Sequence, residues 1–319
     1  MILLLFVLVS ASVCAFNPVG RVGRASHVSM VDKMFAESDT VVELDEGQLT
    51  RQRYIASNRF QVRDGKGPKF EKRWADRKSR LATLDGFRFF TLLKRTHTEG
   101  FDMDAPDYHD GNYVSFTIWE NKDNFDAWRT GDAFKEAHGG GKFNIAGFVS
   151  LISTALFIIK GSPKPAFYDA LLPVSENILK HKPHLSSANE NAEGGWRQVD
   201  ADGTNEIPPE VFVSQDLYTV KDGMAAQFER GFADKMAEQG VGGRTAANNG
   251  MLSFSLLRRD AAKADDGVTH SAWRLWTDET AYKAWKGKTR GADFISDTTS
   301  ATKTALYEGK LTLVAPQGP

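Results

Sequence analysis

His138 is the residue whose type and setting suggest the clearest chemistry in this chain. It follows Phe134 by four positions, so the two side chains share one face of a predicted helix. Three glycines, residues 139–141, follow at once, and they end the helix and leave room beside the imidazole. A neutral imidazole next to a roomy apolar site can ligate a haem iron. The alternative is a histidine that only interacts favourably with the helix dipole.

Asn58 is the second candidate, because it lies among apolar residues on one face of a predicted strand. The alternation predicts a half-buried strand over residues 54–62. Its core-facing side chains are Tyr54, Ala56, Asn58, Phe60 and Val62, and its outward side chains are Ser57, Arg59 and Gln61. A buried amide without a hydrogen bond costs about 1–3 kcal/mol. Asn58 therefore bonds local backbone or donates to an oxygen of a ligand.

Both candidates belong to a pattern that the chain carries twice. Residues 117–138 correspond to residues 274–298, with paired positions Trp119/Trp276, Trp128/Trp285 and Phe134/Phe294. Because both copies keep the tryptophans, core packing accounts for Trp128 and Trp119. The copies differ at the polar candidates, since Asp216 stands for Asn58 and Thr298 for His138. This asymmetry predicts an active site in the first copy only.

Each copy predicts the order strand, helix, strand, strand, helix, strand. In the first copy the helix starts near Pro68, the next strands cover residues 86–95 and 113–120, and residues 122–138 form helix interrupted near Gly131. An extended segment follows at residues 166–175. The second copy has strands at 211–220, 254–259, 271–276 and 311–314, with a helix around Phe228. Two such units predict an α+β protein of two ferredoxin-like domains in tandem, paired as an internal pseudo-dimer.

The N-terminus predicts a targeting segment over residues 1–31. Residues 2–13 are apolar and too short to span a membrane, and small residues precede Phe16. The following stretch is basic and lacks acids until Asp32, which is typical of a bipartite plastid presequence; plain secretion is the alternative. The first domain then covers residues 32–181, a polar linker 182–208 and the second domain 209–319.

Residues 145–159 form an apolar extension of the first domain that is too short for a spanning helix. Three interpretations fit it: a buried helix, a hydrophobic wall over a ligand pocket, or shallow contact with a membrane.

Composition narrows the function classes. The chain has 40 Lys+Arg against 41 Asp+Glu, a net charge of −1, which gives no support to a nucleic-acid partner. The single cysteine, Cys14, lies in the predicted presequence, so the mature chain has no thiolate chemistry. The sequence contains no phosphate-binding loop, HExxH motif or nucleophile elbow.

The segments SNRFQV, FEKRWADR, GFRFFTLLKR and YVSFTIWENKDNFDAWRTGDAFKEAH together resemble the antibiotic-biosynthesis-monooxygenase (ABM) family, whose fold is a dimeric α/β barrel. They look most like its haem-degrading branch, the IsdG type. The resemblance covers residues 54–138 closely, and residues 211–315 resemble a second, diverged ABM domain.

The resemblance implies roles for three residues. His138 would bind the haem iron, Asn58 would donate to the distal ligand of the iron, and Trp128 would press on the porphyrin. The implied reaction opens haem oxidatively with O2 and an external electron donor, such as a reductase, and releases iron. A haem carrier without turnover, a cofactor-independent ABM monooxygenase acting on a quinone-like molecule, and a purely structural protein are the alternatives.

Overall fold

The structure is a computed structural model that describes residues 47–75, 81, 84–99, 111–132, 157–173, 211–238, 250–260, 266–286 and 293–314. All of these belong to one unit, Asp45–Pro319. His138, most of the apolar extension and the predicted domain boundaries lie outside the described residues. The boundaries therefore stay predictions.

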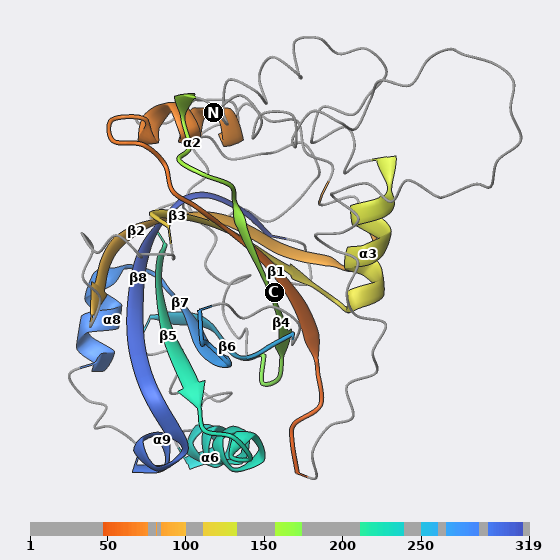
Figure 1. Ribbon diagram of the computed structural model, residues 1–319, viewed down its shortest axis with the longest axis vertical. Coiled ribbons are helices and arrows are strands. Elements are labelled where there is room, and N and C mark those ends of the chain that lie inside the picture. Colours follow the sequence, from red (N-terminus) through yellow and green to blue (C-terminus); the bar gives the residue numbers. More distant parts are fainter. Residues whose placement is uncertain are drawn as a thin grey trace, which may run out of the picture. The chain divides into compact units, whose positions relative to one another are not determined.

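Eight strands of the described chain close one antiparallel barrel (Figure 1). The first four are β1 (Arg53–Phe60), β2 (Phe87–Glu99), β3 (Tyr113–Trp119) and β4 (Lys164–Ala170). The last four are β5 (Phe212–Val220), β6 (Met251–Arg259), β7 (His270–Trp276) and β8 (Thr299–Val314). Around the barrel the order is β1-β3-β2-β8-β5-β7-β6-β4.

The barrel order contains the same arrangement twice. The first half reads β4-β1-β3-β2 and the second reads β8-β5-β7-β6, which is the ferredoxin-like order for a β-α-β-β-α-β unit. Pairing of β2 with β8 and of β4 with β6 joins the halves. The structure thus confirms the predicted α+β fold of two ferredoxin-like units.

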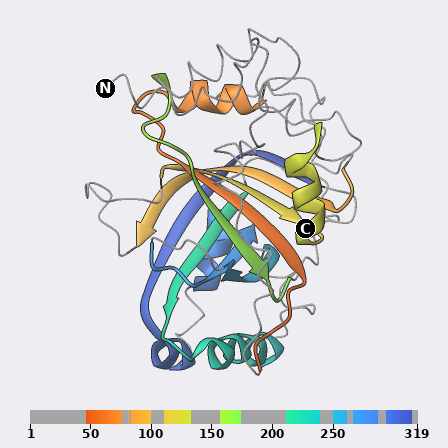
Figure 2. The same cartoon turned by 45° about the vertical axis from the view of Figure 1, so that its right-hand side comes forward.

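Helices lie on the outside of the barrel (Figure 2). Helices α2 (Gly67–Ala75) and α3 (Lys122–Thr130) belong to the first half; α6 (Ala225–Glu238), α8 (Glu279–Lys286) and α9 (Asp293–Thr298) belong to the second. Each group packs on the outer face of the barrel and forms a separate apolar cluster there, and the cluster of the first group also includes Leu311 of β8.

Local signals fix the ends of α3. The Asn121 side chain accepts a hydrogen bond from the Asn124 backbone N–H at 2.9 Å, which caps the first turn. At the other end the Gly131 N–H donates to the Trp128 carbonyl at 3.1 Å. The predicted interruption near Gly131 is confirmed.

The last strand differs from the prediction. We expect a strand over residues 311–314 from the sequence, whereas β8 begins at Thr299 and runs for 16 residues. It pairs with β2 along one edge and with β5 along the other. Because its length is set by partners distant in sequence, the local pattern underestimates it.

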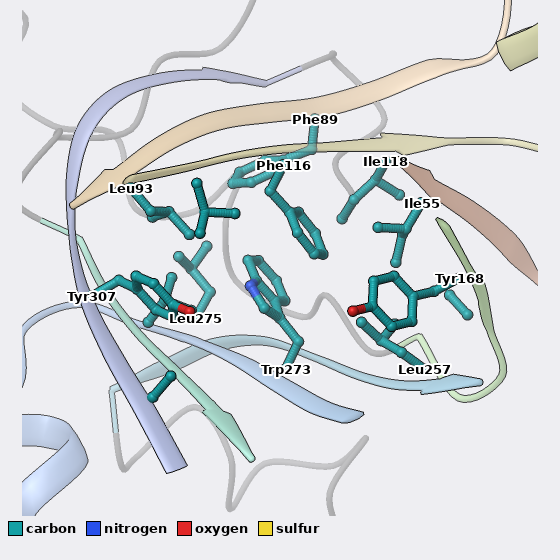
Figure 3. Close-up of a cluster of buried hydrophobic side chains, with 14 of the residues drawn as sticks. Ile55, Phe89, Leu93, Phe116, Ile118, Tyr168, Leu257, Trp273, Leu275 and Tyr307 are labelled. Carbon is teal, nitrogen blue, oxygen red and sulfur yellow. The ribbon is translucent and has the colours of Figure 1, made fainter. Parts of the chain in front are cut away.

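The barrel interior is filled by apolar side chains from both halves (Figure 3). At its centre the rings of Phe116 and Trp273 stack with centroids 4.8 Å apart and planes 4° from parallel. The two residues occupy equivalent positions of β3 and β7, opposite Ser57 and Gln215 in the strand registers. The pseudo-twofold axis that relates the halves therefore passes between these two rings.

Reciprocal polar contacts cross the seams between the halves. Arg95 on β2 donates to the Tyr307 hydroxyl on β8 at 3.0 Å, and Arg259 on β6 donates to the Tyr168 hydroxyl on β4 at 2.8 Å. Each guanidinium also lies over the ring of its tyrosine, at 5.3 and 5.1 Å. Such an exchange of equivalent contacts is the signature of a twofold interface, so the halves are arranged as an internal pseudo-dimer.

One prediction about β1 is wrong. The strand is expected to be half-buried, but Ile55 and Ser57 on its other face are buried inside the barrel. Arg59 also lies on that face and forms an ion pair with Asp266 at 2.6 Å. The second half covers this face by closing the barrel, an effect that alternation within one strand does not reveal.

Removal of the central stack should destabilise both halves together. We expect Trp273→Ala to lower the free energy of unfolding by about 3–5 kcal/mol, in a single urea transition monitored by circular dichroism. Trp273→Phe is the matched control, because it keeps an aromatic stack and removes an indole N–H that has no hydrogen-bond partner among the described residues. Two separate transitions in the wild-type protein would contradict a shared core.

Candidate functional site

The candidate site lies on the outer face of β1, where the strand meets the helices of the first half. Tyr54, Ala56 and Phe60 project from this face into the cluster with α2 and α3. Asn58 lies between Ala56 and Phe60 with the same parity, and it pairs in register with Ser115 on β3 and Pro165 on β4. Asn58 thus shares the face of Tyr54, Ala56 and Phe60, as the alternation predicts, and the structure shows that this face lies on the outside of the barrel beneath the helices.

Aromatic rings line the face beside Asn58. Phe60 contacts Phe70 and Trp74 of α2, with ring centroids 5.3 and 5.9 Å away. Trp74 in turn stacks on Phe90 of β2 at 5.6 Å. This part of the site offers broad, flat apolar surface and belongs to the same cluster as α3.

Trp128 lies on α3 at the edge of this cluster and is half-buried. Its ring packs against Trp119 at 5.4 Å and against Phe125 at 5.7 Å. In the second half Trp285 packs against Trp276 at 5.2 Å and against Tyr282 at 6.3 Å. The two tryptophans have the same setting, so the fold determines where Trp128 lies.

The polar residue on β1 has a different environment in each half. None of the residues that the structure describes hydrogen-bonds the half-buried Asn58 side chain. Asp216, at the equivalent place on β5, accepts from Arg274 at 2.6 Å and from Thr304 at 2.7 Å. A neutral amide without a described partner thus corresponds to a fully engaged carboxylate.

Arg274 fills the corresponding region of the second half. Its guanidinium lies 4.8 Å from the centroid of Trp285 and 5.3 Å from that of Phe254, between α8 and the sheet. Burial tends to lower the pKa of Arg274, but the neighbouring Asp216 carboxylate raises it above the ordinary value. The charged pair is therefore a fixed part of this half.

The first half has a small side chain where Arg274 stands. The equivalent position on β3 is Thr117, whose hydroxyl donates to the Ala56 carbonyl at 2.9 Å. A threonine cannot extend over Trp128 as Arg274 extends over Trp285. The alignment of the two copies did not predict this difference, although Thr117 and Arg274 stand two residues before the matching Trp119 and Trp276.

Each half also holds a buried glutamate that the sequence interpretation did not use. In the first half the Tyr113 hydroxyl donates to Glu71 of α2 at 2.5 Å. Burial, and then this hydrogen bond, raise the pKa of Tyr113. The signal was present in the sequence, because a glutamate follows a phenylalanine at the same place in both predicted helices.

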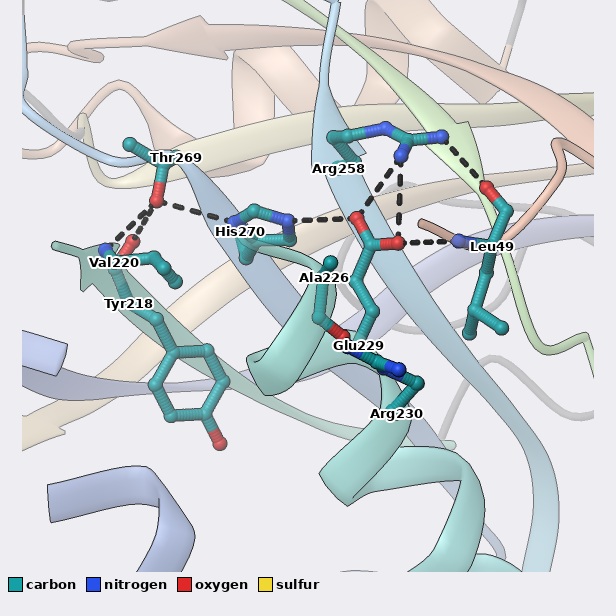
Figure 4. A network of polar contacts seen from close by, with 9 residues as sticks. All are labelled: Leu49, Tyr218, Val220, Ala226, Glu229, Arg230, Arg258, Thr269 and His270. Carbon is teal, nitrogen blue, oxygen red and sulfur yellow. Dashed lines mark hydrogen bonds and ion pairs between the residues drawn. The ribbon is translucent and has the colours of Figure 1, made fainter. Parts of the chain in front are cut away.

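The corresponding glutamate of the second half joins more partners, as Figure 4 shows. Glu229 of α6 accepts from Arg258 at 3.0 Å and from the Leu49 backbone N–H at 2.6 Å, and it contacts His270 at 3.1 Å. All of these partners come from the same unit of the chain. Glu71 and Glu229 therefore anchor helices to the sheet.

His138 itself lies outside the described residues, so its role stays a prediction. The equivalent Thr298 is described: it is fully buried at the end of α9, and its hydroxyl donates to the Phe294 carbonyl at 2.6 Å. Phe294 lies against Gly231 of α6, where an added Cβ would come within 2.4 Å of the ring. In the second half this position is thus an inward-facing helix end without an imidazole.

The described residues contain neither a cluster of metal-ligating side chains nor a helix able to span a membrane. No group of three or more histidine, cysteine, aspartate or glutamate side chains could hold a metal ion within the described ranges. No helix in the same part of the chain is long and apolar enough to cross a membrane.

Comparisons with known proteins agree with the geometry. Residues 53–140 match the model of the antibiotic biosynthesis monooxygenase family. A haem oxygenase (staphylobilin-producing) from Staphylococcus haemolyticus is 34% identical over 86 residues, which are 27% of this chain and 72% of that protein. A protein of the same name from Staphylococcus saprophyticus is 30% identical over 87 residues, or 27% and 74% of the two chains.

A solved structure of a candidate monooxygenase from Fusobacterium nucleatum has a similar fold, with a TM-score of 0.51. It covers 83% of this chain and 96% of its own at 10% identity, so it supports the fold alone. Fold and site together define a barrel of two ferredoxin-like units whose first half carries an aromatic cluster on its outer face. The chain belongs to the ABM family, as its motifs predict.

The ion pair in the second half should behave as a coupled unit. We expect Arg274→Thr to cost about 3–5 kcal/mol in urea unfolding, because it leaves the Asp216 carboxylate mostly buried without its cation. The double variant Arg274→Thr/Asp216→Asn should recover most of that loss in a double-mutant cycle. Lys283→Ala breaks an exposed pair and serves as a control that costs less than about 1 kcal/mol. Additive losses in the cycle would contradict the coupling.

Proposed function

We propose that this protein is a haem-binding monooxygenase that opens haem oxidatively and releases iron, with its site in the first half. The observation that carries the proposal is the contrast between equivalent outer faces. Asn58 and Thr117 leave a neutral face beside Trp128, whereas Asp216 and Arg274 close the other face with an ion pair. The haem oxygenase relatives support the choice of substrate.

The described residues fit a flat, apolar macrocycle. The cluster formed by α2, α3 and the outer face of β1 is aromatic, and it contains Phe60, Trp74 and Trp128 as half-buried rings. Planar contact with such rings excludes water from a haem face. Within the described residues Asn58 is an amide on this face without a side-chain hydrogen bond, so it has donors left for a ligand.

Three residues would divide the work in the first half. His138 would hold the haem through its imidazole, Asn58 would donate its amide N–H to an oxygen of the bound ligand, and Trp128 would contact the macrocycle. The haem itself supplies the redox chemistry when bound. The chain therefore contributes binding, orientation and a hydrogen bond where negative charge develops.

The proposed reaction also requires an oxidant, an electron donor and a cellular location. O2 is the oxidant and an external donor supplies electrons, delivered by a reductase. Residues 1–31 would direct the protein to a plastid, or into a secretory route if the segment acts as a plain signal peptide.

Hemin titration tests the binding step. We expect a Soret band in the wild-type protein and its loss or strong shift in His138→Ala, because the proposed iron ligand is removed. His184→Ala, in the predicted linker, is the matched control and should titrate like the wild type. If the wild-type protein gives no Soret band, the proposal that it binds haem is wrong. A cofactor-independent monooxygenase is then the better-supported function.

Turnover under air with a reductant and catalase tests the role of Asn58. We expect Asn58→Ala to bind hemin as the wild type does but to lose about 10–1000-fold in the rate of Soret decay and iron release, since one polar donor is removed. Catalase removes free peroxide, so the Soret decay that remains is due to turnover by the protein. A wild-type protein that binds hemin without decay would be a haem carrier, and an unchanged rate in the variant would exclude this role for Asn58.

A further inference from the structure

One corner of the first half combines exposed cations with an exposed aromatic side chain. Phe157 is 63% exposed, and it is the one exposed large apolar side chain among the residues that the structure describes. The next two residues, Ile158 and Ile159, are buried in the cluster under α2. The chain is thus anchored immediately after Phe157 while the ring of Phe157 faces solvent.

Backbone hydrogen bonds place the turn between β1 and α2 beside this aromatic residue. The Arg63 N–H donates to the Ile158 carbonyl at 2.8 Å, and the Lys160 N–H donates to the Gln61 carbonyl at 2.7 Å. Val62 and Ile159 form a bridge between these two bonds. The side chains of residues 61–69 and 157–160 therefore share one corner of the molecule.

The charges at this corner are mostly positive. Arg63, Lys66, Lys69 and Lys160 are all exposed, and none of them forms an ion pair with a described residue. The opposing charge within residues 61–69 and 157–160 is Asp64 alone, so the corner carries a net charge of +3 in a chain whose total is −1. A local surplus of this kind attracts an anionic surface.

The combination of cations with an aromatic side chain points to a lipid surface. Cationic side chains gain about 1 kcal/mol each near an anionic bilayer, and an aromatic ring next to them can enter the region of the headgroups. Phe157 also lies near the end of the apolar run of residues 145–159, a composition that suits a bilayer better than a polar, acidic protein.

We propose that Arg63, Lys66, Lys69 and Lys160, together with Phe157, form a peripheral contact surface for an anionic lipid bilayer. The contact is reversible, because four cations and one ring give far less binding energy than a spanning segment. The proposal is independent of the proposed oxygenase activity, since none of these residues belongs to the haem site.

Co-sedimentation with vesicles tests this surface. We expect the protein that begins after the predicted presequence to bind phosphatidylcholine vesicles containing phosphatidylglycerol and not vesicles of phosphatidylcholine alone. Lys66→Glu/Lys69→Glu should lower the partition coefficient about tenfold or more, since two attractive charges become repulsive. Phe157→Ser should lower it as well, and Phe157→Trp should preserve it.

The charge reversal has a matched control on the other half. Lys283→Glu/Lys286→Glu changes the net charge equally on exposed residues of α8 and should leave binding nearly unchanged. The reversals at Lys66 and Lys69 lie at the start of α2, where acidic residues favour the helix, so folding should persist; circular dichroism checks this.

Three outcomes would overturn the proposal. The first is that the wild-type protein binds neutral and anionic vesicles equally well. The second is that the α8 control variant loses as much vesicle binding as Lys66→Glu/Lys69→Glu. The third is that Phe157→Ser keeps full vesicle binding and the protein binds a soluble acidic protein equally tightly. The last would indicate a protein partner recognised by charge alone. Soret titration of each variant reports separately on the haem site, so failure here leaves that proposal untouched.

Discussion

The structure depends on the burial of two sheet faces against each other inside one barrel. Each ferredoxin-like half has an inner face of large apolar side chains, and exposing either face to water would greatly lower the free energy of unfolding. The stack of Phe116 on Trp273 marks the centre of this contact. The reciprocal pairs Arg95–Tyr307 and Arg259–Tyr168 close its two seams with satisfied polar groups.

Because the contact between the inner faces holds the barrel together, the outer faces of the two halves can differ in sequence without loss of the fold. Both halves keep the same arrangement there: a glutamate that anchors a helix and a tryptophan that packs on another tryptophan. On this common arrangement the second half has the Asp216–Arg274 pair, while the first half has Asn58 and Thr117. The two outer faces of one barrel thus differ in charge and hydrogen bonding although the elements beneath them are the same.

Several features could be predicted from residues alone because they follow from local periodicity. The parity of β1 put Asn58 on the face of Phe60, and the shared positions of Trp128 and Trp285 predicted their common packing role. The order of strands and helices in both copies followed from the same alternation and helical spacing. His138 lies outside the described residues, so its proposed role as haem ligand is supported by the sequence alone.

By itself, the sequence determined the duplicated β-α-β-β-α-β order, the family, and the positions at which the two copies differ. Only the tertiary structure decided that β1 is buried on both faces, that β8 extends along two partners, and that Arg274 covers Trp285. The reason is physical. Periodicity reports which side of an element is apolar, but the contacts that close a barrel or fill a pocket join residues far apart in the chain.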